Sequence, residues 1–408
     1  MATEEEVNPF DYSDYMGVGK ARERTFETEV PIGFNHSALL EPYRTRYFVE
    51  DEIVRDCEIE VDPAHRGIER ILQGMPVDKA NIITERICGI CSHGHLWNSV
   101  RTGDIGLGTE IPDAAVAIRV LGEELERIHS HLIFIAHACE VLGHETFAMR
   151  TFLMREPIQD MLYLVSGNRV HYAIPVLGGV RPRCQITEWK AKKIRSIVDD
   201  LEVKLKKFVD RILSDMMVMS RLSGAGYCDK QTAVKYHSVG PTGRASGIEW
   251  DYRTTMYEYD DFDWQMVVLD EGDNAARVKT RALEIFVSID LVRQAIEKAA
   301  GDTDVLNRDW ELGPMPTQES YIEVPRGELY HSYGLDEHGH VKHYKVRTPT
   351  MTSMAAMEVA CIGDQLTDAV VTLASCDPCL ACCNRFAVVD ERGRERLMSL
   401  DDLRRKRV

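Results

Sequence analysis

The spacing of hydrophobic and polar residues changes at about residue 62. Between residues 29 and 62 apolar and polar side chains alternate, as in Tyr43-Arg-Thr-Arg-Tyr-Phe-Val-Glu-Asp-Glu-Ile-Val54 and Cys57-Glu-Ile-Glu-Val61. A period of two is typical of strands that bury one face. This region therefore predicts a small N-terminal antiparallel β-sheet.

From residue 63 to residue 385 apolar positions mostly recur every three or four residues, as they do on one face of a helix. Helices are predicted over 113–144, 145–168, 188–222, 263–300 and 351–374, beside a loop at 103–112. Short alternating segments at 321–325, 328–333 and 343–347 predict a second small sheet, with the turn Asp336-Glu-His-Gly-His340 between the last two. The predicted class is mainly α with small β-sheets (α+β): a helical bundle with an N-terminal antiparallel sheet.

The two ends of the chain differ from this pattern. Residues 1–28 are acidic and lack periodicity, which predicts a flexible arm. Residues 386–408 form a C-terminal tail beyond the 63–385 domain. The start of the chain does not resemble a signal peptide, and no apolar run approaches the roughly 18 residues of a membrane span.

Net charge and cysteine content narrow the function. A formal charge of −17 argues against a general nucleic-acid-binding protein, which needs a basic face. Eleven cysteines without an export signal predict reduced thiols in the cytosol. Five of them stand alone and are predicted to be buried and inert: Cys57, Cys139, Cys184, Cys228 and Cys361.

Two C-x-x-C pairs carry the candidate chemistry. Cys88 and Cys91 form the first pair, and Cys379 and Cys382 form the second, with 288 positions (379 − 91) between the inner cysteines. Two such pairs permit a site in which four thiolates bind metal. The alternatives to a reactive metal site are a structural zinc site and a redox dithiol. Structural zinc motifs, however, usually keep their two halves close in sequence.

The segments around both pairs carry a resemblance. Arg86-Ile-Cys-Gly-Ile-Cys-Ser-His-Gly-His95 and Asp377-Pro-Cys-Leu-Ala-Cys-Cys-Asn-Arg385 resemble the paired signatures of nickel–iron hydrogenase large subunits, in particular the membrane-bound, energy-converting group related to complex I. Weaker motifs agree in order: His65-Arg-Gly-Ile-Glu69, Glu124-Leu-Glu-Arg-Ile-His-Ser-His131, Gly178-Gly-Val-Arg181, Gly240-Pro-Thr-Gly-Arg-Ala-Ser-Gly247, Glu323-Val-Pro-Arg-Gly-Glu328 and Arg347-Thr-Pro-Thr350.

The resemblance implies a metal centre for reversible hydrogen oxidation. Cys88, Cys91, Cys379 and Cys382 would bind nickel. Cys91 and Cys382 would also bridge to an iron that carries CO and cyanide ligands. Soft thiolate ligands suit both metals. The resemblance also allows a magnesium ion.

Further site residues follow from the same resemblance. Arg326 would donate hydrogen bonds to the cyanide ligands, and Pro325 and Thr350 would line the same pocket. His95 would hydrogen-bond a bridging thiolate and so tune the metal without binding it. The alternatives are an exposed arginine after a proline and a simply packed histidine.

Cleavage of hydrogen releases a proton, so a base is needed. The resemblance assigns Glu69 as the first proton relay, whereas the alternative is a surface carboxylate with an i,i+4 partner on a helix. Glu124 and His131 would serve proton passage or belong to a solvated helix face.

The resemblance also implies partners and a location. Electrons would leave through a small subunit with a 4Fe–4S cluster, and membrane-arm subunits would translocate ions at the cytoplasmic side of the membrane. A maturation protease would cleave the tail after Arg385. One alternative is the quinone-reductase subunit of complex I: the segment Asn35-His-Ser-Ala-Leu39 resembles its quinone-cavity hairpin, but that subunit lacks the cysteine ligands. The other is a non-enzymatic scaffold stabilised by metal.

Overall fold

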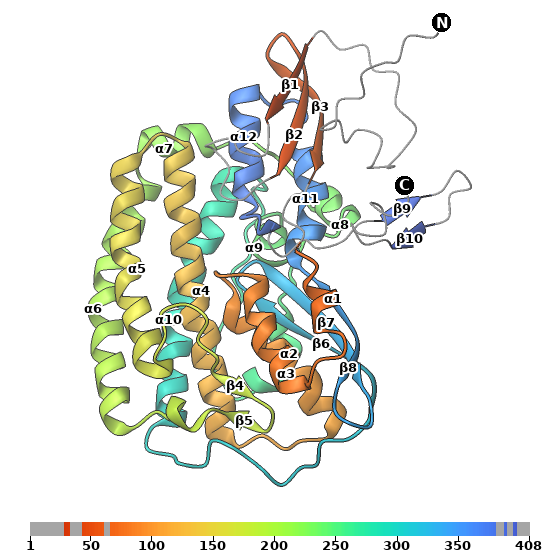
Figure 1. The fold of residues 1–408 in the computed structure, drawn as a ribbon. Coiled ribbons are helices and arrows are strands. Elements are labelled where there is room, and N and C mark those ends of the chain that lie inside the picture. Colours follow the sequence, from red (N-terminus) through yellow and green to blue (C-terminus); the bar gives the residue numbers. More distant parts are fainter. Residues whose placement is uncertain (1–27, 33–42, 61–65, 381–386, 390–394, 398–408) are drawn as a thin grey trace, which may run out of the picture.

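A computed structural model describes residues 28–32, 43–60, 66–380, 387–389 and 395–397 (Figure 1). Its helices are α1 Ile68–Leu72, α2 Val77–Thr84, α3 Ser92–Leu107, α4 Asp113–Val141, α5 Glu145–Ser166, α6 Glu188–Leu213, α7 Met216–Leu222, α8 Lys230–Lys235, α9 Gly240–Arg244, α10 Asn274–Ala299, α11 Pro349–Ala360 and α12 Leu366–Ser375. Short 3-10 turns are η3 Glu85–Ile87, η4 Pro182–Cys184, η5 Tyr252–Thr255 and η6 Tyr257–Tyr259. The strands are β1 Thr28–Ile32, β2 Arg44–Glu50, β3 Ile53–Glu60, β4 Pro175–Val176, β5 Gly179–Val180, β6 Met315–Val324, β7 Gly327–Leu335, β8 Val341–Arg347, β9 Ala387–Val389 and β10 Glu395–Leu397.

Four long helices form the bundle at one side of the molecule (Figure 1). Helix α4 packs against α5 and α10, and α6 covers α5 and α10 from outside. Because α6 borders solvent, it is amphipathic and buries one face with residues such as Ile194, Leu201 and Leu205. Helix α4 is buried on nearly every face, charged residues included. The predicted class, mainly α with small sheets, is confirmed.

The predicted helices 113–144 and 145–168 match α4 and α5, but three others are shorter than expected. The segment 188–222 divides into α6 and α7 because the Asp215 carboxylate accepts the N–H groups of Met217 and Val218 and starts a new helix. The segment 263–300 becomes helical only at Asn274, where Asp273 provides the same cap. The segment 351–374 divides between α11 and α12, and Gly363 turns the chain there with a φ of 95°.

The predicted loop 103–112 is wrong over its first half, because α3 continues to Leu107. The glycines that suggested a loop allow close packing instead. A Cβ atom on Gly103 would lie 2.5 Å from the Tyr333 hydroxyl, and one on Gly106 would lie 2.1 Å from the Met315 sulfur. These glycines let α3 lie directly on the sheet β6–β7–β8.

The N-terminal sheet has the antiparallel order β1–β2–β3, as predicted. The segment 43–54 is two strands and not one, since Asp51 and Glu52 form a left-handed turn with φ of 49° and 64°. The sheet packs on α11 and α12 (Figure 1). Val54 N–H donates to the Asp364 carbonyl over 2.9 Å, which fixes that contact.

The second sheet has the order β6–β7–β8 and contains two tight turns. Pro325 and Arg326 form the two-residue turn between β6 and β7, since Val324 pairs with Gly327. The predicted turn 336–340 joins β7 to β8, and the Asp336 carboxylate accepts the N–H groups of His338 and His340. The sheet is tied to α3 by the Asn98 side chain, which donates to the carbonyls of Ser320 and Leu329.

Several predicted features lie outside the described residues. These are the arm 1–28 except for Thr28, the segment Asn35-His-Ser-Ala-Leu39, Cys382, and most of the tail 386–408, of which only β9 and β10 are described. Among the described helices none combines the length and apolar character needed to cross a membrane.

Candidate metal centre

Three of the four predicted ligands converge. The sulfur atoms of Cys88, Cys91 and Cys379 all lie within 4.8 Å of one another, and the Sγ atoms of Cys88 and Cys379 are 3.1 Å apart across 291 residues of sequence. All three side chains are buried. The fourth, Cys382, lies outside the described residues.

The first cysteine turn joins η3 to α3. Cys88 ends η3, and its sulfur accepts the N–H groups of Ile90 over 3.3 Å and Cys91 over 3.4 Å. Cys91 is the residue directly before α3. The Arg66 guanidinium donates to the carbonyls of Arg86 and Ile87, so the turn is held from the side of α1 as well.

The second cysteine turn follows α12. Asp377 adopts a left-handed conformation with a φ of 58°, which is uncommon for a residue other than glycine. Two residues later, the Cys379 N–H donates to the Thr350 hydroxyl at 3.0 Å. Arg281 donates to the carbonyl of Cys376 at 3.0 Å. The strained turn is therefore held by hydrogen bonds on both sides.

The thiol geometry fits a bound metal. Metal–sulfur bonds of about 2.3 Å in a tetrahedral arrangement place sulfur atoms roughly 3.8 Å apart. One pair of thiols is 3.1 Å apart and all three lie within 4.8 Å of one another, so their separations are of this order. Thiolate ligands suit nickel, iron and zinc alike. The arrangement supports a metal site without selecting among these metals.

Arg326 lies beside the thiols and is buried, so the alternative of an exposed arginine is wrong. Its guanidinium donates to the Asp377 carbonyl over 2.7 Å and to the Asp377 carboxylate over 2.8 Å. Burial opposes its charge, but the carboxylate of Asp377 and then the thiolates of Cys379, Cys88 and Cys91 raise the pKa of Arg326 well above its usual range. Arg326 therefore keeps a positive charge against the thiols.

The remaining predicted pocket residues are buried as well. Pro325 precedes Arg326 in the β6–β7 turn, and Thr350 lies in the first turn of α11. His95 is buried in α3, and its Nδ1 lies 3.1 Å from the Nε2 of His331. Burial lowers the pKa of His95 to about 4, so the ring is neutral at neutral pH. A bond from His95 to a thiolate would use its Nε2.

Glu69 faces strand β8. Its carboxylate accepts the N–H of Val346 over 2.8 Å and lies 3.3 Å from the Lys345 ammonium. The side chain is 17% exposed. These contacts tie Glu69 to strand β8.

Glu124 and His131 are fully buried, so the predicted solvated helix face is wrong. Glu124 accepts from Tyr259 over 2.7 Å and from Ser288 over 2.6 Å, and it pairs with Arg127. His131 Nε2 lies 2.8 Å from the Glu284 carboxylate, while burial lowers the pKa of His131 to about 4. Both residues belong to a buried charged network.

Four residues at the site were not singled out from the sequence: Arg66, Glu126, Arg281 and His331. Arg66 lies within the motif at 65–69 and Glu126 within the segment Glu124–His131, but neither motif distinguishes the residue from its neighbours. One signal for Glu126 is that the middle of α4, residues 119–127, carries five charged residues on more than one face, as expected of a buried ionic network rather than of an amphipathic helix.

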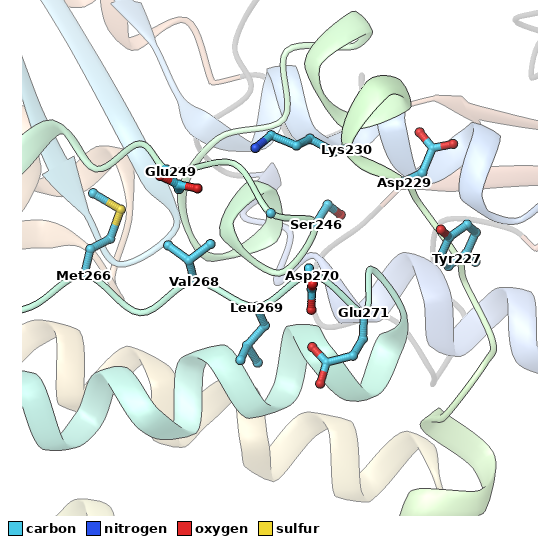
Figure 2. A pocket seen from close by; sticks show the side chains of 11 residues that line it. Tyr227, Asp229, Lys230, Ser246, Glu249, Met266, Val268, Leu269, Asp270 and Glu271 are labelled. Atoms are coloured by element: carbon cyan, nitrogen blue, oxygen red, sulfur yellow. The ribbon is translucent and has the colours of Figure 1, made fainter.

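The surface has a hollow away from the thiols, and none of the three cysteines lines it. Figure 2 shows this hollow, of about 1050 Å³, between the start of α8 and the extended segment before α10. Its charged lining comprises one cation, Lys230, and the four carboxylates Asp229, Glu249, Asp270 and Glu271. No residue predicted for the metal centre contributes to it.

Comparison with known proteins confirms the resemblance. Residues 141–321 and 313–385 match the family described as respiratory-chain NADH dehydrogenase, 49 Kd subunit. Residues 66–141 match the family described as nickel-dependent hydrogenase. The chain belongs to the family that joins these hydrogenases to the 49 kDa subunit. The named members of this hydrogenase and 49 kDa family are oxidoreductases.

Relatives in this family are named either as hydrogenase subunits or as NADH-quinone oxidoreductase subunits. The membrane-bound hydrogenase subunit alpha of Pyrococcus furiosus is 32% identical over 92% of this chain and 91% of its own length. Hydrogenase-4 component G of Escherichia coli is 27% identical over 90% of this chain and 63% of its own length. An NADH-quinone oxidoreductase subunit of Geobacillus thermodenitrificans is 26% identical over 87% of this chain and 97% of its own length.

A solved structure shares the fold. It is a chain of the membrane-bound sulfane sulfur reductase, an archaeal respiratory membrane complex, with a TM-score of 0.81 and 24% identity. The similarity covers 88% of this chain and 98% of that chain.

Proposed function

We propose that this chain is the catalytic large subunit of a membrane-associated nickel–iron hydrogenase. It would catalyse reversible hydrogen oxidation and proton reduction, coupled to ion translocation by partner subunits. The observation that carries the proposal is the convergence of three buried thiols from opposite ends of the chain. Similarity to a membrane-bound hydrogenase subunit along 92% of the chain supports it.

The proposed ligand set comes from the family resemblance, and the meeting of three of its cysteines supports it. Cys88, Cys91, Cys379 and Cys382 would hold nickel, with Cys91 and Cys382 shared with the iron. When bound, the nickel–iron centre supplies the reversible cleavage of hydrogen. The chain contributes a dry site for it, since the three described thiols are buried.

Side chains around the thiols would orient the centre. Arg326 holds a fixed positive charge beside the three thiols and would donate to the cyanide ligands. Thr350 fixes the backbone of Cys379, and Pro325 shapes the adjacent turn. His95 would support a bridging thiolate through its Nε2, and Glu69 would receive the proton.

Electron and ion transfer would require other subunits. Among the described residues, Cys88, Cys91 and Cys379 are the one group of side chains placed to hold a metal. A small subunit with a 4Fe–4S cluster would therefore carry the electrons, next to membrane-arm subunits at the cytoplasmic side. A maturation protease would act on the tail after Arg385.

Metal analysis and infrared spectroscopy on the purified complex test this proposal. We expect about one nickel and one iron per chain and infrared bands of CO and cyanide. Cys379→Ser should lose nickel and hydrogen-dependent dye reduction, because one thiolate is removed from the site. Cys139→Ser is the matched control, since Cys139 is a buried cysteine outside the group of three thiols.

Other metal contents would favour other functions. Zinc alone would overturn the hydrogenase in favour of a metal-stabilised scaffold. Absence of metal would favour a quinone-reducing subunit, and the match of residues 141–385 to the 49 kDa family makes this the second candidate. Full activity in Cys379→Ser would refute the ligand assignment.

A further inference from the structure

One buried carboxylate reaches from α4 to the beginning of α3. Glu126 is fully buried, and its Oε1 accepts the His93 N–H over 2.8 Å and the Ser92 hydroxyl over 3.3 Å. Its Oε2 accepts the Gly94 N–H over 3.0 Å. Together, the two oxygens accept hydrogen bonds from three consecutive residues.

These three residues directly follow Cys91. The first N–H groups of any helix lack partners within the helix and need an acceptor from elsewhere. Cys91, at the cap position of α3, accepts none of them with its side chain. Glu126 supplies the acceptor from another helix, and a carboxylate is also favoured by the helix dipole at this end.

The contact between the two helices leaves little room for adjustment. A Cβ atom on Gly122 of α4 would lie 2.5 Å from the His93 ring, and one on Gly94 would lie 3.2 Å from the Glu123 carboxylate. The His93 Nε2 also lies 2.9 Å from the Arg119 carbonyl. The start of α3 is therefore fixed in position relative to α4.

We infer that Glu126 is a positioning residue that fixes the Cys91 thiol by holding the first turn of α3. The inference rests on the proposed function in one respect, that Cys91 is a metal ligand. It differs from a general stabilising role because it predicts a local effect on one cysteine.

Three variants of the full-length chain test the inference. Glu126→Ala removes both acceptor oxygens, and Glu126→Gln keeps one oxygen and turns an amide N–H₂ toward a backbone N–H. Glu140→Gln is the control, because Glu140 belongs to the same helix but its side chain is 61% exposed. Chain produced without nickel is treated with iodoacetamide, and modification of each cysteine is followed by mass spectrometry.

We expect Cys91 to be modified about tenfold faster or more in Glu126→Ala than in the unchanged chain, with Glu126→Gln between them. Cys228 and Cys361 report global unfolding because they belong to a separate apolar cluster and are buried. Their rates should not change. In the loaded complex, Glu126→Gln should shift the CO and cyanide bands while nickel is retained.

Two results would overturn the inference. One is an unchanged rate at Cys91 in Glu126→Ala. The other is a rate that rises only in parallel with those of Cys228 and Cys361, which would indicate general destabilisation. The alkylation experiment needs no metal, so it decides the role of Glu126 even if the unchanged complex lacks nickel and the proposed function fails.

Discussion

Single side chains around the thiols are held by residues far away in the sequence. Cys379 is fixed by Thr350, Asp377 by Arg326, and the turn after Cys91 by Glu126. Thr350, Arg326 and Glu126 come from different helices or strand turns. A conservative substitution at one of these three residues should therefore alter the site while the fold persists.

Glu69 can be tested as a proton carrier separately from its structural contact. Glu69→Gln keeps an oxygen that accepts the Val346 N–H, but the amide cannot take up a proton. We expect nickel content to be unchanged and H/D exchange between hydrogen gas and water to fall by about a hundredfold, the usual size of a general-base contribution.

Glu358→Gln is the control for that substitution. Glu358 on α11 also accepts a strand N–H, that of Ile59, over 2.9 Å. Loss of exchange in both variants, or in neither, would contradict a proton role for Glu69 and leave it as a tie between α1 and β8.

At the scale of elements, the close contact between α3 and the second sheet depends on glycine. The Tyr333 hydroxyl donates to the Ser99 carbonyl over 3.0 Å and occupies the space where a Cβ on Gly103 would lie. Gly103→Ala would gain about 1 kcal/mol of helix propensity. We nevertheless expect a net loss of about 1–3 kcal/mol in the free energy of unfolding, because a packed core does not absorb an extra methyl group.

Urea unfolding measures that loss, and Gly313→Ala is the control. A Cβ atom on Gly313 would meet no heavy atom within 4 Å. If Gly103→Ala were as stable as the unchanged chain, then α3 could move away from the sheet without cost.

Periodicity predicted most elements because it reflects burial, but it did not predict their ends. The break between α6 and α7 depends on the side chain of Asp215 turning back to its own backbone, and hydrophobic spacing does not report such a cap. Gly103 shows the converse error, since a glycine that permits packing has the same sequence signature as one that ends a helix.

At the scale of the whole molecule, the meeting of Cys88, Cys91 and Cys379 was predictable, but many of the contacts around them were not. Spacing permitted a split thiolate site, and the resemblance supplied Arg326, Thr350 and His95. The contacts of Glu126 with His93 and of His331 with His95 depend on which helix face packs against which helix or strand. That information exists only once α3, α4 and β7 have packed together.

The interior beside the site is ionic, and it links distant parts of the chain. Arg244 on α9 lies 2.7 Å from the Glu284 carboxylate of α10 and 2.8 Å from that of Glu323 on β6. It also lies 3.1 Å from the Asp251 carboxylate. All four side chains are almost completely buried, so the bundle and the second sheet are joined by charges that water cannot screen.

Arg244→Met should therefore be among the most damaging single changes. It leaves three buried carboxylates without their shared cation, and breaking a buried pair typically costs about 3–5 kcal/mol. Arg293→Met is the comparison. Arg293 also has three acidic partners, but its side chain is 26% exposed, so its loss should cost less than about 1 kcal/mol. Urea unfolding midpoints compare the two. Equal midpoints would mean that the buried network does not hold the bundle against the sheet, and that packing alone keeps Cys379 near Cys88 and Cys91.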